Sequence, residues 1–439
     1  MAAVWIMSLL SLAAEPAAVL VAPDDMEFLA VMARDTLEAS RVPAGASVAG
    51  VGPNTTGGTV IRPGGRNAYP AFWIRDYAMS LDCGLVPEGE QRHALFLTAR
   101  HQVDGAITLP TGSTLPPGSI PDHISFGGVP IFFPGILQEY DKQGGEKWGM
   151  LPCLDDQFFF IHMAWWYERT VGGAEFLGEA VNGIPLIERL ERAWAMPPSE
   201  PDSGIVMVDD RNRGVNFGFF DTVVHTGKLF FASVLKYRAA LELADLEEKA
   251  GRTAQAAEYR EKAAALKAAL PGVFVLENGW CRASTGRSGQ PDVWGTAYAV
   301  VADALPEPHK AKASRVLADA LRAGTIALRG NIRHVPMDAD FSGESAWETC
   351  YAAKNTYQNG AYWGTATGWV FLAVRDTAPE LAAALARDYV QELRDGDFRR
   401  DEKHGSPWEC FHPDGNHRQN PVYLASVSVP LAMFQQGVK

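Results

Sequence analysis

The chain has 439 residues, of which 47 % are hydrophobic and 21 % are charged, a balance typical of a globular protein with enough apolar material for a large core. This composition excludes an intrinsically disordered chain. The formal net charge is −13 and no Lys/Arg-rich run is present, so nucleic acid and anionic membrane surfaces are disfavoured as partners.

The amino-terminal stretch, residues 1–24, contains an apolar run from Val4 to Leu12 that is followed by small residues. This pattern resembles a short export signal, although no Lys or Arg precedes the run and the same stretch could begin an apolar helix. We expect a periplasmic or secreted protein if the segment is a signal, and a cytoplasmic one otherwise. Beyond it, no apolar run reaches the roughly 18 residues that span a bilayer, so we expect a soluble chain.

Helical periodicity dominates the rest of the chain, and strand-like alternation is scarce. Apolar and charged residues alternate at spacings of three and four over five segments, which predict long amphipathic helices at 25–40, 222–250, 253–270, 309–323 and 379–394. More apolar helices are predicted at 92–103, 154–170, 293–305, 362–374 and 423–435. We therefore expect an all-α protein with ten or more helices.

Long polar or Gly/Pro-rich loops separate these helices, at 51–69, 109–128, 198–217, 279–292 and 397–420. Structureless loops longer than about 12 to 15 residues are uncommon unless they carry function. No low-complexity linker or abrupt charge shift divides the chain. We therefore predict a single domain over residues 25–439, built from paired helical hairpins. The amphipathic helices should lie outside, the more apolar, Trp-bearing helices inside, and the loops on an active-site face.

Charged residues interrupt an aromatic run at 69–82, YPAFWIRDYAMSLD, where Arg75 and Asp76 follow Trp73 closely. A buried charge must be paired or hydrogen-bonded, so these two residues either form a structural ion pair or line a polar pocket. In a pocket, the Asp76 carboxylate would accept hydrogen bonds from sugar hydroxyls.

Asp221 follows a Gly-Phe-Phe sequence and precedes a predicted helix, within VNFGFFDTVVHTGKLFFASVL at 215–235. One interpretation is a helix N-cap, a position that Asp favours. The other is catalytic: a carboxyl group partly desolvated beside two Phe side chains has a raised pKa, which suits a general acid near neutral pH. The residues alone leave both interpretations open.

Glu409 lies between Trp408 and Cys410 in the last long loop, within GSPWECFHPDGNHRQNP at 405–421. A flanking Trp would hold this carboxylate more tightly than an ordinary surface carboxylate. Surface exposure is the simpler alternative.

Amide groups and aromatic rings are combined in TYQNGAYWGTATGW at 356–369, and polar residues also open the aromatic helix at 154–170. The candidate ligand-binding side chains in these two segments are Gln358, Asn359, Trp363, Asp156 and Gln157. N-capping is the simpler explanation for Asp155 and for Asp292, which precedes another helix. In a ring of helical hairpins, loop-to-helix junctions on one face converge, so we expect Asp76, Asp221 and Glu409 to meet in one central pocket.

Together these segments resemble the six-hairpin, (α/α)6-barrel glycosidases, which include glucoamylase-like enzymes and the family 63 type of glucosidases and glycosylglycerate hydrolases. The motifs that carry the resemblance are FWIRDYAMS, GFFDTVVHTGKLFFASVL, YQNGAYWGTATGW and SPWECFHPDG. They are similar to the W-x-R-D signature, the acid-bearing loop and helix, the Trp-rich inner helix and the base-bearing loop of that superfamily. The resemblance implies an all-α, (α/α)6 toroid.

The resemblance also implies roles for individual residues. Asp76 would bind the hydroxyls of the sugar in the −1 subsite, with Arg75 beside it, while Asp221 would be the general acid and Glu409 the general base. Further sugar-binding residues would be Trp73, Asp156, Gln157, Arg333, Gln358, Asn359, Trp363 and Trp408. The chain lacks the G-x-D-N context that is usual around the family 63 acid, so Glu344 and Glu348 remain rival acids. Glu348, preceded by Trp347, resembles a Trp-Glu pair of the rhamnosidase branch.

These roles predict inverting hydrolysis of a terminal sugar, α-linked and glucoside- or mannoside-like, with two carboxyl groups roughly 6.5 to 9.5 Å apart. No metal or organic cofactor is expected, because the five cysteines form neither a CxxC pair nor a zinc-ligand spacing. The net negative charge favours a neutral sugar.

Three alternatives remain. An unsaturated-uronyl hydrolase or lyase on the same barrel would need basic residues for a carboxylate, and the candidates are Arg333, His334, His412, His417 and Arg418. An epimerase would need a pair of pocket histidines. A non-catalytic carbohydrate-binding protein would keep the aromatic pocket without the acid and base.

Overall fold

The computed structural model describes residues 19–66, 68–412 and 414–438, and within these ranges the chain forms twelve α-helices. The odd-numbered helices are α1 (Pro23–Ser40), α3 (Glu88–Arg100), α5 (Leu186–Ala195), α7 (Thr253–Phe274), α9 (His309–Ala323) and α11 (Pro379–Asp395). The even-numbered helices are α2 (Ile74–Ser80), α4 (Asp156–Val171), α6 (Phe230–Lys249), α8 (Val293–Val301), α10 (Thr367–Arg375) and α12 (Ala425–Gly437).

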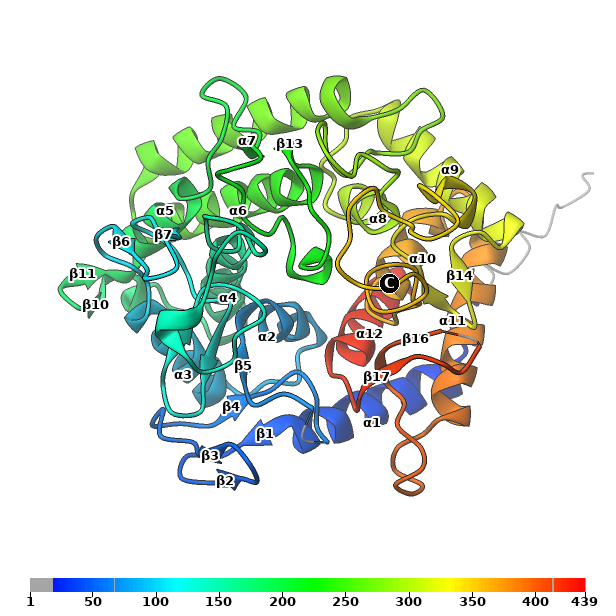
Figure 1. Ribbon diagram of the computed structural model, residues 1–439, viewed down its shortest axis with the longest axis horizontal. Helices are drawn as coiled ribbons and strands as arrows, with labels where there is room; N and C mark the ends of the chain where they lie inside the picture. Colours follow the sequence, from blue (N-terminus) through cyan, green and yellow to red (C-terminus); the bar gives the residue numbers. More distant parts are fainter. Residues whose placement is uncertain (1–18, 67, 413, 439) are drawn as a thin grey trace, which may run out of the picture.

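The even-numbered helices contact one another in a closed cycle. Each packs on the next along the chain, from α2 through α4, α6, α8 and α10 to α12, and α12 packs back on α2. The odd-numbered helices pack on the outside of this cycle, for example α7 on α6, α9 on α8 and α11 on α10. Figure 1 shows the even-numbered, inner helices around the centre and the odd-numbered, outer helices at the periphery.

Burial explains which helices lie inside. The inner helix α8 is apolar on all sides and buries every residue from Val293 to Val300. The outer helix α11 buries a single stripe whose members, from Ala382 to Leu393, recur at spacings of three and four residues. A helix that is apolar all round needs neighbours on every side, whereas an amphipathic helix needs only one.

The predicted helices are confirmed within a few residues, with three differences. The helix predicted at 222–250 begins only at Phe230, and as α6 it belongs to the inner cycle although we expected it outside. Its charged residues Glu242 and Glu247 are buried because they pair with Arg238 and Arg252. Helix α3 lies outside although we placed it among the apolar, inner helices. Helices α2 and α5 were not predicted: the seven residues of α2 are too short for a clear period, whereas the apolar stripe of α5 was overlooked.

Short antiparallel strands lie in the loops. They are β1 (Arg41–Val42), β2 (Ser47–Val48), β3 (Gly52–Pro53), β4 (Val60–Ile61), β5 (Ala71–Trp73), β6 (Ile107–Thr108), β7 (Thr114–Leu115), β8 (His123–Ser125), β9 (Pro130–Ile131), β10 (Ala180–Val181), β11 (Ile184–Pro185), β12 (Met207–Val208), β13 (Gly227–Lys228), β14 (Ala327–Leu328), β15 (Asn331–Ile332), β16 (Trp408–Phe411) and β17 (Arg418–Pro421). Strands β5, β8 and β9 form a three-stranded sheet in the order β5-β8-β9, and the others pair as β1-β4, β2-β3, β6-β7, β10-β11, β12-β13, β14-β15 and β16-β17.

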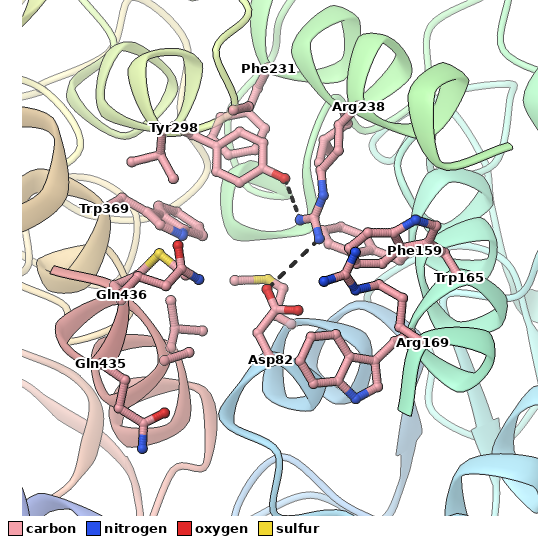
Figure 2. A pocket seen from close by; sticks show the side chains of 18 residues that line it. Asp82, Phe159, Trp165, Arg169, Phe231, Arg238, Tyr298, Trp369, Gln435 and Gln436 are labelled. Carbon is pink, nitrogen blue, oxygen red and sulfur yellow. Dashed lines mark hydrogen bonds and ion pairs between the residues drawn. The ribbon is translucent and has the colours of Figure 1, made fainter. Parts of the chain in front are cut away.

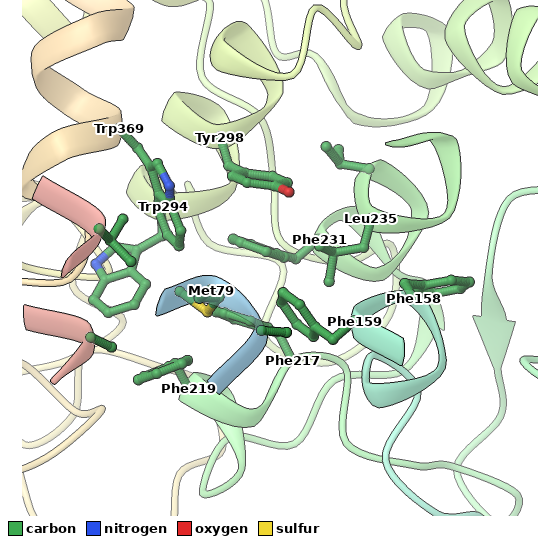
Figure 3. Packing of buried hydrophobic residues seen from close by; sticks show 14 of the residues in the cluster. Met79, Phe158, Phe159, Phe217, Phe219, Phe231, Leu235, Trp294, Tyr298 and Trp369 are labelled. Atoms are coloured by element: carbon green, nitrogen blue, oxygen red, sulfur yellow. The ribbon is translucent and has the colours of Figure 1, made fainter. Parts of the chain in front are cut away.

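Aromatic side chains fill the centre of the ring (Figure 3). Phe217 stacks on Phe231 with ring centroids 4.1 Å apart. Phe219 lies 5.6 Å from Trp294, which lies 5.9 Å from Trp369. All five side chains are buried, and we call them the central aromatic layer.

No helix in the described part of the chain is both long and apolar enough to cross a membrane. The export signal expected within residues 1–24 falls almost entirely outside the described residues, which begin at residue 19.

Candidate active site

Three carboxyl groups from distant parts of the sequence line one cavity of about 190 Å³, which we call the carboxylate cavity. Asp76 lies in the first turn of α2, Asp221 directly follows the 3-10 helix η4 (Gly218–Phe220), and Glu409 lies in β16. The segments that lead into α2, α6, α10 and α12 all contribute to the wall, so the cavity lies at the amino-terminal ends of the inner helices. The structure thus brings together the three carboxyl groups that the sequence singled out.

Asp76 is 6 % exposed and faces the start of α12. The Tyr423 hydroxyl donates a hydrogen bond to its Oδ1. Because Tyr423 immediately precedes α12, the contact between α12 and α2 that closes the inner cycle also fixes this carboxylate.

Arg75 points away from Asp76 and pairs with three other carboxylates. Its guanidinium lies 2.7 Å from an oxygen of each of Asp122, Asp155 and Asp156, and its side chain is 4 % exposed. Arg75 therefore finds internal partners, as one of the two interpretations expected, and it also lies in the cavity wall. Adjacent helical residues project about 100° apart, so Asp76 is left free for the cavity.

Asp221 is held at its position by the backbone on either side of it. The Gly218 N–H donates to Asp155 Oδ2 at 2.9 Å, and Gln358 accepts from the Thr222 N–H at 2.8 Å while donating to the Gly218 carbonyl at 3.2 Å. The N-cap interpretation of Asp221 is wrong, because the following residues form a loop with β13 and α6 begins only at Phe230. Asp221 Oδ1 is buried and has no hydrogen-bond partner among the described residues.

Glu409 is 1 % exposed and lies in a hairpin instead of an irregular loop. Strands β16 and β17 pair with Cys410 opposite Gln419, which brings Asn420 beside Glu409. Asn420 Nδ2 donates to Glu409 Oε2 at 2.5 Å, and the Tyr69 hydroxyl donates to Oε1 at 2.7 Å. Both carboxylate oxygens are therefore fixed.

Burial raises the pKa of all three carboxyl groups, to about 6 for Asp76, about 7 for Asp221 and about 8 for Glu409. Loss of hydration is the largest cause in each case. At Glu409 the hydrogen bonds from Tyr69 and Asn420 oppose the rise, while the charges of Asp76 and Asp221 add to it. The cavity therefore retains protons near neutral pH.

The hydrogen bonds of Asp221 and Glu409 differ in kind. Two donors to Glu409 suit an ionised carboxylate, whereas the unpartnered, buried oxygen of Asp221 suits a carboxyl group that holds a proton for a ligand. Glu409 nevertheless has the higher pKa, about 8 against about 7 for Asp221. The pKa values and the hydrogen bonds therefore favour opposite orders of proton loss. Because the two groups repel each other when both are charged, the cavity loses its first proton more readily than its second.

Seven residues predicted to bind sugar lie outside the wall of the carboxylate cavity: Asp156, Gln157, Arg333, Gln358, Asn359, Trp363 and Trp408. Each has a structural reason. Asp156 neutralises Arg75, Arg333 pairs with Asp340 at 2.6 Å, and Asn359 accepts from the Ala346 N–H. Gln157 and Trp363 are completely buried, and Gln358 holds the backbone around Asp221. Trp408 lies beneath the Arg418 guanidinium, 5.8 Å from it.

The rival residues are also placed elsewhere. Glu344 and Glu348 are exposed, and Glu348 accepts a hydrogen bond from the Ser288 N–H at 2.7 Å. The basic residues considered for a uronate ligand lie outside the cavity wall: Arg333, His334, His412, His417 and Arg418. Among the described residues of the wall, the cationic or titratable basic side chains are Arg75 and His123, and both contact Asp122.

Sequence reasoning missed several wall residues: Tyr69, Asp122, His123, Tyr357 and Tyr423. His123 stacks on Trp73 with ring centroids 4.3 Å apart, and its two nitrogens lie 2.6 Å from Asp122 Oδ2 and 3.1 Å from the Leu137 carbonyl. A long loop at 109–128 was a signal for this part of the wall. The pairing of β5 with β8, which places Trp73 opposite His123, has no counterpart in the hydrophobic pattern.

Asp122, Cys153 and Asp156 lie close enough together to hold a metal ion. The guanidinium of Arg75 already lies 2.7 Å from both carboxylates. This cluster therefore suits the arginine, whose charge takes the place of a metal.

The comparisons with known proteins agree with this architecture. Residues 181–422 match the model of the mannosylglycerate hydrolase MGH1-like glycoside hydrolase domain. No curated protein sequence matches the chain.

Solved structures share the fold at low sequence identity. A family 63 mannosylglycerate hydrolase from Thermus thermophilus, in complex with glucose, has a TM-score of 0.54 at 15 % identity, over 93 % of this chain and 100 % of that chain. A rhamnosidase from Klebsiella oxytoca with rhamnose bound has a TM-score of 0.54 at 13 % identity, over 96 % of this chain. The match spans only 66 % of that rhamnosidase. A wild-type glycosidase has a TM-score of 0.54 at 12 % identity, over 95 % of this chain and 98 % of that chain.

Proposed function

Because the chain belongs to the mannosylglycerate hydrolase MGH1-like glycoside hydrolase family, we propose that it removes a terminal neutral sugar from a small glycoside or oligosaccharide by inverting hydrolysis. The relationship to the six-hairpin, family 63-like glycosidases that the motifs indicated is confirmed by this match and by the structural neighbours. We further propose that residues 25–439 form one catalytic domain, an (α/α)6 toroid. The closed cycle of inner helices supports that architecture.

The observation that carries the proposal is the meeting of Asp76, Asp221 and Glu409 in the carboxylate cavity. The first lies near the beginning of the chain and the last near its end, and ionised carboxyl groups repel each other when they are buried together. A fold that gathers three of them without neutralising them by nearby cations carries a stability cost. Function is the usual reason for such a cost.

In the proposed reaction, Asp221 donates its proton to the glycosidic oxygen as the bond to the anomeric carbon breaks. Glu409 removes a proton from a water molecule that attacks this carbon from the opposite face of the sugar ring. The Tyr69 and Asn420 hydrogen bonds orient Glu409 toward that water. Asp76, fixed by Tyr423, accepts hydrogen bonds from the hydroxyls of the same sugar.

The wall of the cavity supports a neutral sugar. The guanidinium of Arg75 is already shared among three carboxylates, and the His123 ring already contacts Asp122. A uronate would therefore meet four carboxyl groups, Asp122 included, and no uncommitted cation among the described wall residues. Aromatic rings and amide groups, such as Trp73 and Asn420, suit a ring of hydroxyls and C–H groups.

Two variants and two kinds of substrate test the roles. Asp221→Asn should lower kcat/KM about 10³-fold on disaccharides and glycosylglycerates, but much less on dinitrophenyl glycosides, whose leaving group needs no proton. Glu409→Gln should lower it about equally on both kinds. Glu348→Gln, at an exposed rival position, is the matched control and should remain active.

Proton NMR of the first-formed anomer, across a panel of α- and β-linked aryl glycosides, disaccharides and glycosylglycerates, tests the stereochemistry. Inversion is expected. A retained anomer would reject Glu409 as the base, and an active Asp221→Asn, Glu409→Gln double variant would reject the site as a whole.

A further inference from the structure

A second and larger cavity, of about 430 Å³, lies at the other end of the inner helices. Its wall is formed by the last residues of α2 and by residues of α4, α6, α8, α10 and α12, so every inner helix contributes (Figure 2). We call it the aromatic cavity, after the six rings in its wall: Phe159, Trp165, Trp166, Phe231, Tyr298 and Trp369.

The aromatic cavity does not communicate with the carboxylate cavity. Phe231 and Trp369 of the central aromatic layer line the aromatic cavity, and Phe219 of the same layer lines the carboxylate cavity. Phe217 and Trp294 pack between them and are buried. A ligand of one cavity is therefore separated from a ligand of the other by packed rings (Figure 3).

Charged groups in the aromatic cavity are rigidly held. Arg238 donates to Glu242 at 2.7 Å and to the Tyr298 hydroxyl at 2.7 Å. The Asp82 Oδ1 atom accepts from His162 at 2.9 Å, and the nearby cations keep its pKa below the usual range although burial opposes them. Asp82 is therefore an ionised acceptor, and Figure 2 shows its carboxylate near the guanidinium groups of Arg238 and Arg169.

Two polar groups of the aromatic cavity have capacity for a ligand that the described residues leave unfilled. They do not include the Arg169 guanidinium, which stacks on Trp165 at 4.6 Å from the ring centroid, and both Arg169 and Gln436 are exposed. Asp82 Oδ2 lies 3.8 Å from Arg238, too far for a hydrogen bond, and the buried Trp166 Nε1–H has no partner among the described residues. A buried N–H without a partner is costly, so this group in particular indicates a missing acceptor.

We propose that the aromatic cavity is a second binding site, separate from the hydrolytic one, for a neutral saccharide. A sugar ring presents C–H faces to aromatic rings and hydroxyls that both donate and accept. It can therefore donate to Asp82 and accept from the Trp166 N–H and from Arg169. An anionic ligand would be repelled by Asp82, and a cationic one by Arg169 and Arg238. A purely apolar ligand would leave all of these groups unpaired.

The test uses the full chain with Glu409→Gln, so that a sugar is bound and not consumed, and with ¹⁵N-labelled tryptophan. Maltotriose and methyl α-D-glucopyranoside are the probes, and the indole N–H resonances are the measurement. Saturable shifts are expected for Trp165 and Trp166, assigned by substitution. Arg169→Met and Trp165→Leu should each weaken this binding about tenfold, the loss expected for one charge-assisted hydrogen bond or one ring contact. Arg315→Met, at an exposed position of α9, is the matched control and should bind normally.

The position of the responding tryptophans separates the two sites. Shifts of Trp73 alone, in the wall of the carboxylate cavity, would overturn the second site while leaving the hydrolase intact. Shifts of Trp165 and Trp166 in a protein that hydrolyses none of the glycosides would support the second site and reject the hydrolase. A crystal structure with the aromatic cavity filled by a second copy of the chain would also overturn the proposal.

Discussion

Arg75 organises much of the wall of the carboxylate cavity. It does so through other carboxylates and not through its sequence neighbour Asp76. Its guanidinium holds Asp122, Asp155 and Asp156 together in a nearly water-free environment. Through Asp155 it also fixes the backbone of Gly218, three residues before Asp221. Removing one partner from a buried ionic cluster leaves uncompensated charges, which is more costly than losing the attraction itself.

We therefore expect Arg75→Gln to lower the free energy of unfolding by about 3 to 5 kcal/mol. Urea unfolding followed by circular dichroism measures this change. The matched control is Arg92→Gln, whose ion pair with Glu179 is 42 % and 44 % exposed and should contribute under about 1 kcal/mol. An equal change in the free energy of unfolding for the two substitutions would show that the buried ionic cluster contributes no more stability than the exposed ion pair.

At this scale the sequence was informative where an acidic residue stood among aromatic ones. Asp76, Asp221 and Glu409 stood out because a carboxylate beside Phe or Trp needs an explanation. Asp122 and His123 lie in a long loop without that contrast, so the loop indicated the region but not these two residues. Asp156 was marked as a polar residue at the start of an aromatic helix and expected to bind sugar, but its partner is Arg75 instead of a ligand.

The short helix η4 directly precedes Asp221. Its first residue, Gly218, packs unusually close to Arg75. A Cβ atom at Gly218 would lie 2.1 Å from the Arg75 guanidinium carbon. Arg75 is held by three ion pairs and cannot move aside, so η4 itself would have to shift.

We expect Gly218→Ala to reduce kcat/KM by at least about tenfold, because displacing a catalytic group by about 1 Å can cost 10²-fold. Steady-state kinetics on a disaccharide measure this loss. Gly105→Ala, where an added Cβ meets nothing within 4 Å, should leave the rate unchanged. A fully active Gly218→Ala enzyme would mean that η4 tolerates movement and that Asp221 needs no exact placement.

Elements with several helical turns were predictable from periodicity, as α7, α9 and α11 illustrate. The start of α6 was not, because the apolar residues at 222–229 continue the pattern although β13 pairs with β12 there. The hairpin of β16 and β17 was also hidden. Its two strands have four residues each, and half of these residues are polar or charged.

The pH dependence of the stability of the whole molecule is affected by the buried carboxyl groups of the carboxylate cavity. Burial raises the folded-state pKa of Asp76 to about 6, of Asp221 to about 7 and of Glu409 to about 8, above the ordinary values of 3.8 and 4.5. Between about pH 4 and pH 8 the folded protein therefore holds protons that the unfolded chain has released. The sign follows: stability from these groups is lost as the pH rises through this range.

We expect Glu409→Gln to remove part of that loss. Its free energy of unfolding, relative to the wild type, should be higher at pH 8 than at pH 5 by on the order of 1–3 kcal/mol. Urea titrations at the two pH values measure this difference. Glu344→Gln, at an exposed carboxyl group, should show the same difference in free energy of unfolding from the wild type at both pH values. A Glu409→Gln protein less stable at pH 8 than at pH 5, relative to the wild type, would contradict the raised pKa.

For the whole molecule, the sequence supported a ring of paired helical hairpins with loops at one end, because it combines amphipathic with more apolar helices and has no linker that divides the chain. It could not indicate the aromatic cavity at the opposite end. The six rings there come from four different inner helices, and each by itself is an ordinary core residue.

The central aromatic layer also determines how a substrate can enter the carboxylate cavity and how the product can leave it. Since Phe219 and the packed rings behind it form a floor, the carboxylate cavity is a dead end instead of a tunnel. A released sugar must leave through the mouth by which the substrate entered, so a long polymer cannot be threaded through and digested in passing. The proposed hydrolase should therefore act at chain ends and release its product after each cleavage.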